Sequence, residues 1–137
     1  MKGGNIAPRY TKDHLSRVLS VIQFYREKTK KPIYLIGHSN GVISESEFLN
    51  QSPDNQRLLA GIIFSGSRNE ANINGPLNIP VLVLHHEADA NGRWTSYANA
   101  KDLYNKIKIL NSSSTQFSAV HGGDSGNDPS TSGHHMY

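Results

Sequence analysis

Short apolar runs alternate along this chain with longer stretches in which apolar residues recur at helical spacing. Four runs are predicted to form strands, within Ile33–Ile36, Leu58–Ser67, Ile79–Asp89 and Gln116–Val120. Three stretches are predicted to form helices: a segment that Thr11 caps and that ends near Thr29, then Val42–Asn50, then Trp94–Leu110. Strands that alternate with helices are typical of an α/β protein with a parallel sheet.

The first and last helical stretches each carry one apolar stripe that is expected to face the core. In the first helix the stripe is Leu15, Val18, Leu19, Ile22 and Tyr25; in the last it is Tyr97, Ala100, Leu103, Tyr104 and Ile107. Pro32 marks the entry to the first strand, and the polar segment Asn69–Asn78 is predicted to be a loop. Residues Gly122–Gly133 form a long predicted loop rather than a boundary between domains, so residues 1–137 constitute one domain.

The pentapeptide Gly37-His38-Ser39-Asn40-Gly41 stands between the first predicted strand and the helix that follows it. Its pattern is G-x-S-x-G, in which a serine at a sharp strand-to-helix turn needs small residues two positions before and after it to avoid a clash with neighbouring strands. Such a turn exposes the Ser39 hydroxyl and puts the Asn40 backbone N–H at a helix N-terminus, where an oxyanion is stabilised. The motif therefore predicts a nucleophile elbow.

With these residues the chain resembles the α/β-hydrolase superfamily of serine hydrolases. Members carry the triad in the order serine, acid, histidine, at the carboxyl ends of strands or in the loops that follow. Asp89, at the end of the third predicted strand, matches the position of the acid. The resemblance implies a partial α/β-hydrolase fold, with a parallel sheet of about four strands flanked by helices.

Three histidines that follow Asp89 are candidates for the base. His121 directly follows the last predicted strand, where the superfamily usually places its histidine. The tail is similar to a narrower bacterial group that ends in Gly-Gly, Asp-Pro-Cys and His-Gly-aromatic, with the last histidine catalytic; His135 before Met136-Tyr137 matches that ending. The resemblance therefore ranks His135 first, His121 second and the adjacent His134 third.

That bacterial group also carries two cysteines, which form an apparent disulfide pair. This chain has Asn91 and Ser130 near those positions and contains no cysteine. Thiolate metal sites and cysteine catalysis are excluded with the disulfide.

The implied chemistry is acyl transfer to Ser39 from a small ester or related compound. His135 would accept the serine proton, Asp89 would orient the imidazole, and water would hydrolyse the acyl-enzyme. This mechanism needs no cofactor and no metal. The bond that is cleaved and the identity of the acyl group stay open, because the loops that build the pocket decide them.

The superfamily has further strands and an oxyanion loop before the elbow, and a closing helix after the histidine. We expect the chain to be the C-terminal part of a larger hydrolase, either truncated or completed by another chain. The elbow strand would then lie at an open sheet edge, which favours self-association. The second oxyanion donor has no candidate in the sequence, so we expect weak activity from this chain alone.

Composition narrows the partners. A hydrophobic content of 36% suffices for a core, and the net charge of +3 comes from scattered residues rather than a basic stripe, which argues against nucleic acid. The apolar runs fall far short of the roughly 20 residues that cross a bilayer. No signal peptide is visible, so a cytoplasmic location is the default expectation.

Two other functions remain open. A non-catalytic relative of the same fold would bind a partner through the open sheet edge. A metal-dependent hydrolase would use His85, His86, Glu87, Asp89 and His121. Adjacent residues of a strand point to opposite faces, so His85 and His86 are poorly placed to share one ion, and His86 is expected to lie in the loop beside Asp89.

Overall fold

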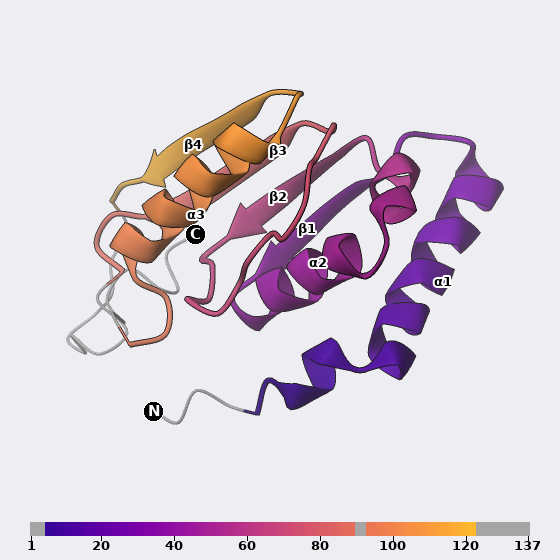
Figure 1. Ribbon diagram of the computed structural model, residues 1–137, viewed down its shortest axis with the longest axis horizontal. Helices are drawn as coiled ribbons and strands as arrows, with labels where there is room; N and C mark the ends of the chain where they lie inside the picture. The colour runs from indigo at the N-terminus through magenta and orange to yellow at the C-terminus, as the bar shows by residue number, and fades with distance from the viewer. Residues whose placement is uncertain (1–4, 90–92, 123–137) are drawn as a thin grey trace.

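The computed structural model describes residues 5–89 and 93–122, which form an α/β fold around one parallel sheet. The sheet has four strands in the order β1-β2-β3-β4, and each strand pairs with its neighbour in parallel (Figure 1). Their bounds are β1 Tyr34–His38, β2 Gly61–Ser65, β3 Val81–His86 and β4 Thr115–Val120. The predicted parallel sheet of four strands flanked by helices is thus confirmed.

The helices follow the predicted order, with shifted ends. They are α1 Lys12–Thr29, α2 Asn40–Gln51 and α3 Tyr97–Leu110, with short 3-10 helices η1 Ala7–Tyr10 and η2 Pro53–Leu58. Thr11 caps α1 through its side chain, as predicted. The last helix begins at Tyr97 rather than Trp94, because Ser96 accepts a hydrogen bond from the Asn99 amide and serves as the N-cap.

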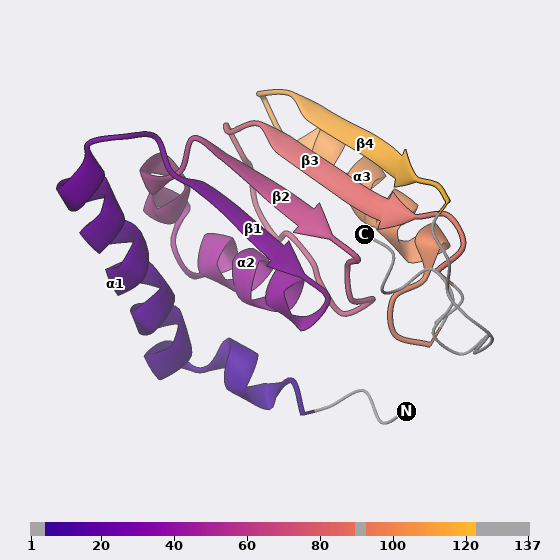
Figure 2. The ribbon, with the colours of Figure 1, turned by 180° about the vertical axis from the view of Figure 1, so that it is seen from behind.

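One face of the sheet is covered and the other is not. Helices α2 and α3 lie on the face seen in Figure 1, whereas Figure 2 shows the strands from behind without a helix in front of them. Helix α1 lies beside α2 and packs against it rather than on the sheet. Side chains alternate between the faces, so Leu35, Ile62 and Val83 point to the helices, while Tyr34 and Ile36 point to the open face and are 62% and 65% exposed.

The hydrophobic core lies between the covered face of the sheet and the helices. Most of its fully buried members come from α2, β2, β3 and α3, among them Phe48, Phe64, Val83 and Ile107, and the loop between β2 and β3 adds Ile73. The predicted stripes supply most of the helical contribution, but Tyr25 is 49% exposed. Among the described helices and strands, α1 contacts α2, η1 and η2, and Tyr25 and Phe24 near its C-terminal end are exposed to solvent.

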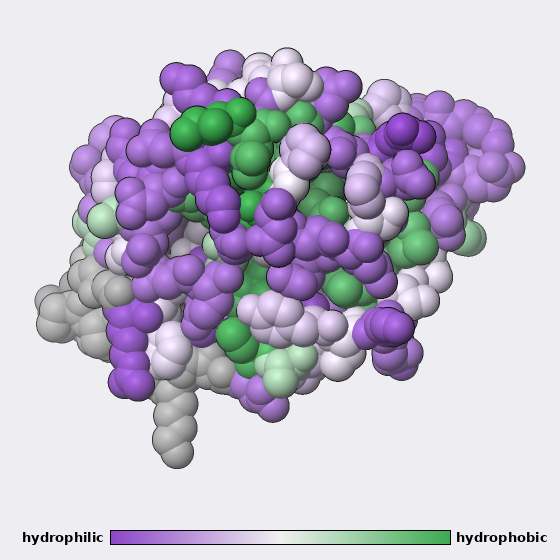
Figure 3. All heavy atoms as spheres, viewed as in Figure 1, coloured by the Kyte–Doolittle hydropathy of each residue, from purple (hydrophilic) through white to green (hydrophobic). Residues whose placement is uncertain are grey.

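Strand β1 is at one edge of the described sheet. The Ser39 amide donates to Ser65 O in β2, and the Ile33 carbonyl accepts from the Ala60 amide just before β2. The backbone groups of the alternate residues Tyr34 and Ile36 therefore point away from β2. The expected unpaired flank of the elbow strand is therefore present in residues 5–89 and 93–122. The helix-side surface in Figure 3 is mostly hydrophilic, with apolar groups visible between polar ones. Among the described segments, no helix is both long and apolar enough to cross a membrane.

Candidate active site

The carboxyl ends of the four parallel strands meet at one edge of the sheet, where the arrowheads lie in Figure 1. Ser39 follows β1, Arg68 lies in the loop after β2, Asp89 follows β3 and His121 follows β4. Helix α2 also begins at this edge. Residues far apart in the sequence are thus gathered where α/β sheets usually bind their ligands.

Ser39 has a backbone conformation that L-residues rarely adopt. Its φ is 54° and its ψ is −116°, at the junction of β1 and α2. The Ser39 amide donates to Ser65 O at 3.0 Å, and its carbonyl accepts from the Val42 amide at 3.1 Å, so both neighbouring elements hold the turn. Although Ser39 is the N-cap residue of α2, its hydroxyl makes no cap hydrogen bond, which a serine at this position usually does.

The two glycines of the motif differ in their surroundings. A Cβ on Gly37 would lie 2.6 Å from Glu45 Cδ and 2.7 Å from the Gly41 carbonyl carbon, which is closer than real Cβ atoms come. A Cβ on Gly41 would meet no described atom within 4 Å. The expectation that both glycines avoid the neighbouring strands is therefore wrong in detail. Gly37 makes room for α2, and Gly41 faces open space.

Glu45 lies beneath the elbow with its carboxyl group buried. The residue is 2% exposed, and neither carboxyl oxygen has a hydrogen-bond partner among the described residues. Burial raises the pKa of Glu45 well above its ordinary value. The nearby Gly37 amide acts to lower this pKa, but the effect of burial is larger.

Asn40, which supplies the candidate oxyanion N–H, is the first residue of α2. The first N–H groups of a helix have no partner inside it, so they are available to a ligand. The side-chain oxygen of Asn40 accepts a hydrogen bond from Arg68 Nη1 at 2.6 Å. Arg68 also donates twice to Glu70, at 3.0 Å through Nε and 2.8 Å through Nη2.

Asp89 is held at the end of β3 by a buried set of contacts. Thr95 Oγ1 donates to its Oδ1 at 3.1 Å, and His85 Nε2 lies 3.4 Å from its Oδ2. The carboxyl group of Asp89 and the ring of His85 are fully buried. His85 Nε2 also lies 2.8 Å from the Thr95 carbonyl, which can only accept, so this nitrogen carries the proton.

His85 and His86 lie on opposite faces of β3. His85 is in ring contact with Tyr97 of α3, whereas His86 Nε2 is bonded to Gly122 O at 2.8 Å. The expectation that His86 is a loop residue is wrong, because it is the last residue of β3 and is 2% exposed. Among residues 5–89 and 93–122, no three His, Cys, Asp or Glu side chains are grouped to hold a metal ion.

Of the three candidate bases, only His121 lies within the described residues. His121 Nδ1 lies 2.7 Å from Glu87 Oε1 in an exposed pair, so its carboxylate partner is Glu87. His134 and His135 lie outside the described residues, as do Asn91 and Ser130. The identity of the base stays a prediction.

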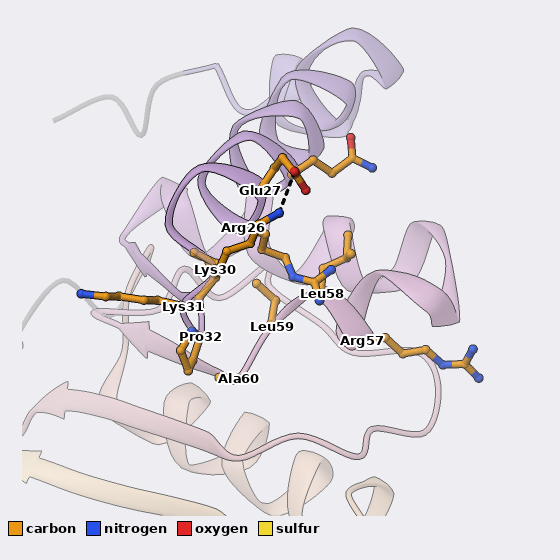
Figure 4. Close-up of a pocket in the computed structure, with 11 residues that line it drawn as sticks. Arg26, Glu27, Lys30, Lys31, Pro32, Arg57, Leu58, Leu59 and Ala60 are labelled. Carbon is orange, nitrogen blue, oxygen red and sulfur yellow. Dashed lines mark hydrogen bonds and ion pairs between the residues drawn. The ribbon is translucent and has the colours of Figure 1, made fainter.

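A groove of about 830 Å³ lies at the opposite end of the strands (Figure 4). It is lined by residues that precede β1 and β2, such as Pro32 and Ala60, and by the basic residues Arg26, Lys30 and Arg57. Lys30 pairs with Glu27 and Arg57 pairs with Asp54. The groove therefore lies far from Ser39. Lys30 and Arg57 form ion pairs with exposed neighbours, as is common on a protein surface.

A scan against protein-family models, a search of curated proteins and a search of solved structures found no match to this chain. Function is therefore inferred from the residues and their geometry alone.

Sequence reasoning overlooked Arg68 and Thr95, and it weighed His85 only as a metal ligand rather than as a neighbour of the Asp89 carboxyl group. Arg68 follows an apolar strand without a recognisable motif, and Thr95 stands in an irregular turn before α3. The one available signal was position: both lie in segments that follow strand ends, where polar side chains of a parallel sheet collect.

Proposed function

We propose that this chain is a serine hydrolase of the α/β-hydrolase class that acts on a small ester or related acyl compound. The observation that carries the proposal is the left-handed backbone of Ser39 at a strand-to-helix turn, with a hydroxyl that does not cap the helix. Backbone strain of this kind costs about 1–3 kcal/mol and persists mainly at functional sites. A serine that only linked β1 to α2 could adopt an ordinary capping conformation instead.

In the proposed mechanism, Ser39 Oγ attacks the substrate carbonyl carbon and gives its proton to a histidine. The Asn40 backbone N–H, at the positive end of α2, stabilises the oxyanion that forms. The histidine then returns the proton to the leaving group, and water releases the acyl group by the same steps. Asp89 orients the histidine, and its buried carboxyl group is supported from behind by Thr95.

His135 remains the proposed base for a geometric reason. Neighbouring strands lie about 4.8 Å apart, so the end of β4 is roughly 14 Å from the end of β1. A base for Ser39 must lie between β1 and Asp89, and His121 at the end of β4 is bonded to Glu87 instead. The chain between Gly122 and His135 is long enough to return across the sheet.

The first test is the intact mass after incubation with a fluorophosphonate probe. The parent and the control Ser20→Ala, whose hydroxyl bonds to Ser16 O on the surface of α1, are each expected to take one adduct. Ser39→Ala is expected to take none. A folded parent without an adduct, or an adduct that persists in Ser39→Ala, would contradict the proposal. Labelling of His135→Ala, His134→Ala and His121→Ala ranks the three bases.

A second candidate is a non-catalytic partner-binding role, favoured by the open edge of β1. The side chains of Tyr34 and Ile36 expose apolar surface on the open face of this strand, and an uncovered parallel edge readily pairs with another strand. The predicted partner is a completing chain or a second copy. Light scattering that shows an oligomer, together with no probe adduct on the folded chain, would favour this role over hydrolysis.

A further inference from the structure

Arg68 is a buried arginine whose guanidinium group is surrounded on several sides. The residue is 4% exposed; Nη1 donates to Asn40 Oδ1 at 2.6 Å, and Nε and Nη2 donate to the two carboxyl oxygens of Glu70. The guanidinium carbon lies 4.9 Å from the centre of the Trp94 ring. The guanidinium group is planar and rigid, so its hydrogen bonds to a carboxylate and to an amide oxygen fix the orientation of both side chains relative to each other.

The charge of Arg68 is balanced locally. Burial alone would raise the pKa of Glu70, but the hydrogen bonds and the attraction from Arg68 outweigh it, so this pKa lies below its ordinary value. Glu70 is therefore ionised at neutral pH. A buried charge is costly unless it is paired and hydrogen-bonded, and this pair meets both conditions.

The residue next to Arg68 extends the same set of contacts toward the acid. The Asn69 amide donates to Trp94 O at 2.7 Å, and Asn69 Oδ1 accepts from the Ser96 amide at 2.9 Å. Between these two partners stands Thr95, which donates to Asp89. The loop after β2 thus bonds on one side to the first residue of α2 and on the other side to the turn that holds Asp89.

We propose that Arg68 is a positioning residue that sets the first turn of α2, and with it the Asn40 N–H, relative to Ser39 and Asp89. The inference rests on the proposed hydrolase function. The described contacts of Arg68 are with Glu70, Asn40 and Trp94, so it is proposed to act through the Asn40 side chain. A displacement of about 1 Å in such a donor can cost about 10²-fold in rate.

The test compares the rates at which variants react with the fluorophosphonate probe. Arg68→Met keeps an unbranched but shorter side chain and removes the donors. We expect adduct formation to be about 10–100-fold slower and, with p-nitrophenyl acetate as substrate, kcat to fall at nearly constant KM. Arg68→Lys, which keeps the charge, should recover part of the rate. The matched control Arg57→Met removes an exposed arginine paired with Asp54 and should react like the parent.

A double-variant cycle distinguishes action through Asn40 from a general structural effect. Asn40→Ala keeps the backbone N–H but removes the acceptor of Arg68, and it should slow labelling about as much as Arg68→Met. The double variant should be labelled no more slowly than the slower of the two single variants. The inference would be overturned if the rate decreases of the two single variants multiplied in the double variant. It would also be overturned if a folded Arg68→Met were labelled at the parent rate.

Two other results have their own tests: an Arg68→Met variant that does not fold, and a parent protein that takes no adduct. If Arg68→Met does not fold, Asn40→Ala should still label at least tenfold more slowly than the parent, and Asn40→Asp, which retains an acceptor for Arg68, should recover part of that loss. Equal rates for the parent and Asn40→Ala would refute the inference. If the parent takes no adduct, the proposed function fails by itself. Positioning is then judged by hydrogen exchange of residues 39–42, which should accelerate in Arg68→Met and in Asn40→Ala, and unchanged exchange would overturn it.

Discussion

The two ends of the candidate site are built in different ways. Ser39 stands at the edge of the described sheet, in a strained turn held by backbone hydrogen bonds and by a close approach between Gly37 and Glu45. Asp89 follows an interior strand and is held by side chains, with Thr95 and His85 around a fully buried carboxyl group. The nucleophile end therefore depends on backbone geometry, and the acid end on buried polar contacts.

The largest expected effect falls on the acid end. Asp89→Asn keeps the size of the side chain but removes the charge that orients the histidine. The rate of fluorophosphonate labelling should fall roughly 10³–10⁴-fold, because the base would lose its orientation and its stabilised charged form. Asp54→Asn, in an exposed pair with Arg57, is the matched control and should label normally. Normal labelling of Asp89→Asn would remove Asp89 from the triad.

Gly37 and Gly41 test the nucleophile end. Gly37→Ala drives a Cβ into Glu45 and the Gly41 backbone, so urea unfolding should show a loss of about 2–3 kcal/mol. Gly41→Ala finds open space inside a helix, where alanine is favoured over glycine, so its stability should stay within about 1 kcal/mol of the parent. Equal losses at both positions would mean that the elbow is not limited by the approach of α2.

Glu45 gives a smaller effect that depends on pH. Its pKa is raised in the folded state, so the folded protein binds this proton more tightly than the unfolded chain. The contribution to stability is present in full below the ordinary value of about 4.5 and is lost as pH rises toward the folded pKa. Glu45→Gln removes this dependence.

Urea unfolding of parent and Glu45→Gln at pH 5 and pH 8 measures the difference directly. The stability gained by the glutamine variant relative to the parent should grow with pH, reaching about 1–3 kcal/mol at pH 8. The difference between the two proteins cancels the opposite contribution of Glu70, whose pKa is lowered. A difference that is constant with pH would contradict a raised pKa for Glu45.

Much of the fold was predictable from local patterns. Capping chemistry predicts Thr11 as the cap of α1. Apolar spacing predicts the strand that contains Leu82 and Val83 and the helical stripe through Ala100 and Ile107. Boundaries were less predictable, because Ser52 and Ser96 each decide where a helical segment begins through a side-chain bond to an amide. The exposure of Tyr25 could not be foreseen, since it depends on where α1 lies relative to α2.

The sequence by itself determined the main helices and strands, their order and the glycine-flanked serine motif, because the hydrophobic period and the motif are local properties. Only the tertiary structure decided what surrounds them. The pairing of Arg68 with Asn40, the burial of Glu45 against Gly37, and the bond of His121 to Glu87 each join segments that meet through the order of the strands or the packing of α2 on β1. Contacts between distant segments are fixed by packing, which no local pattern specifies.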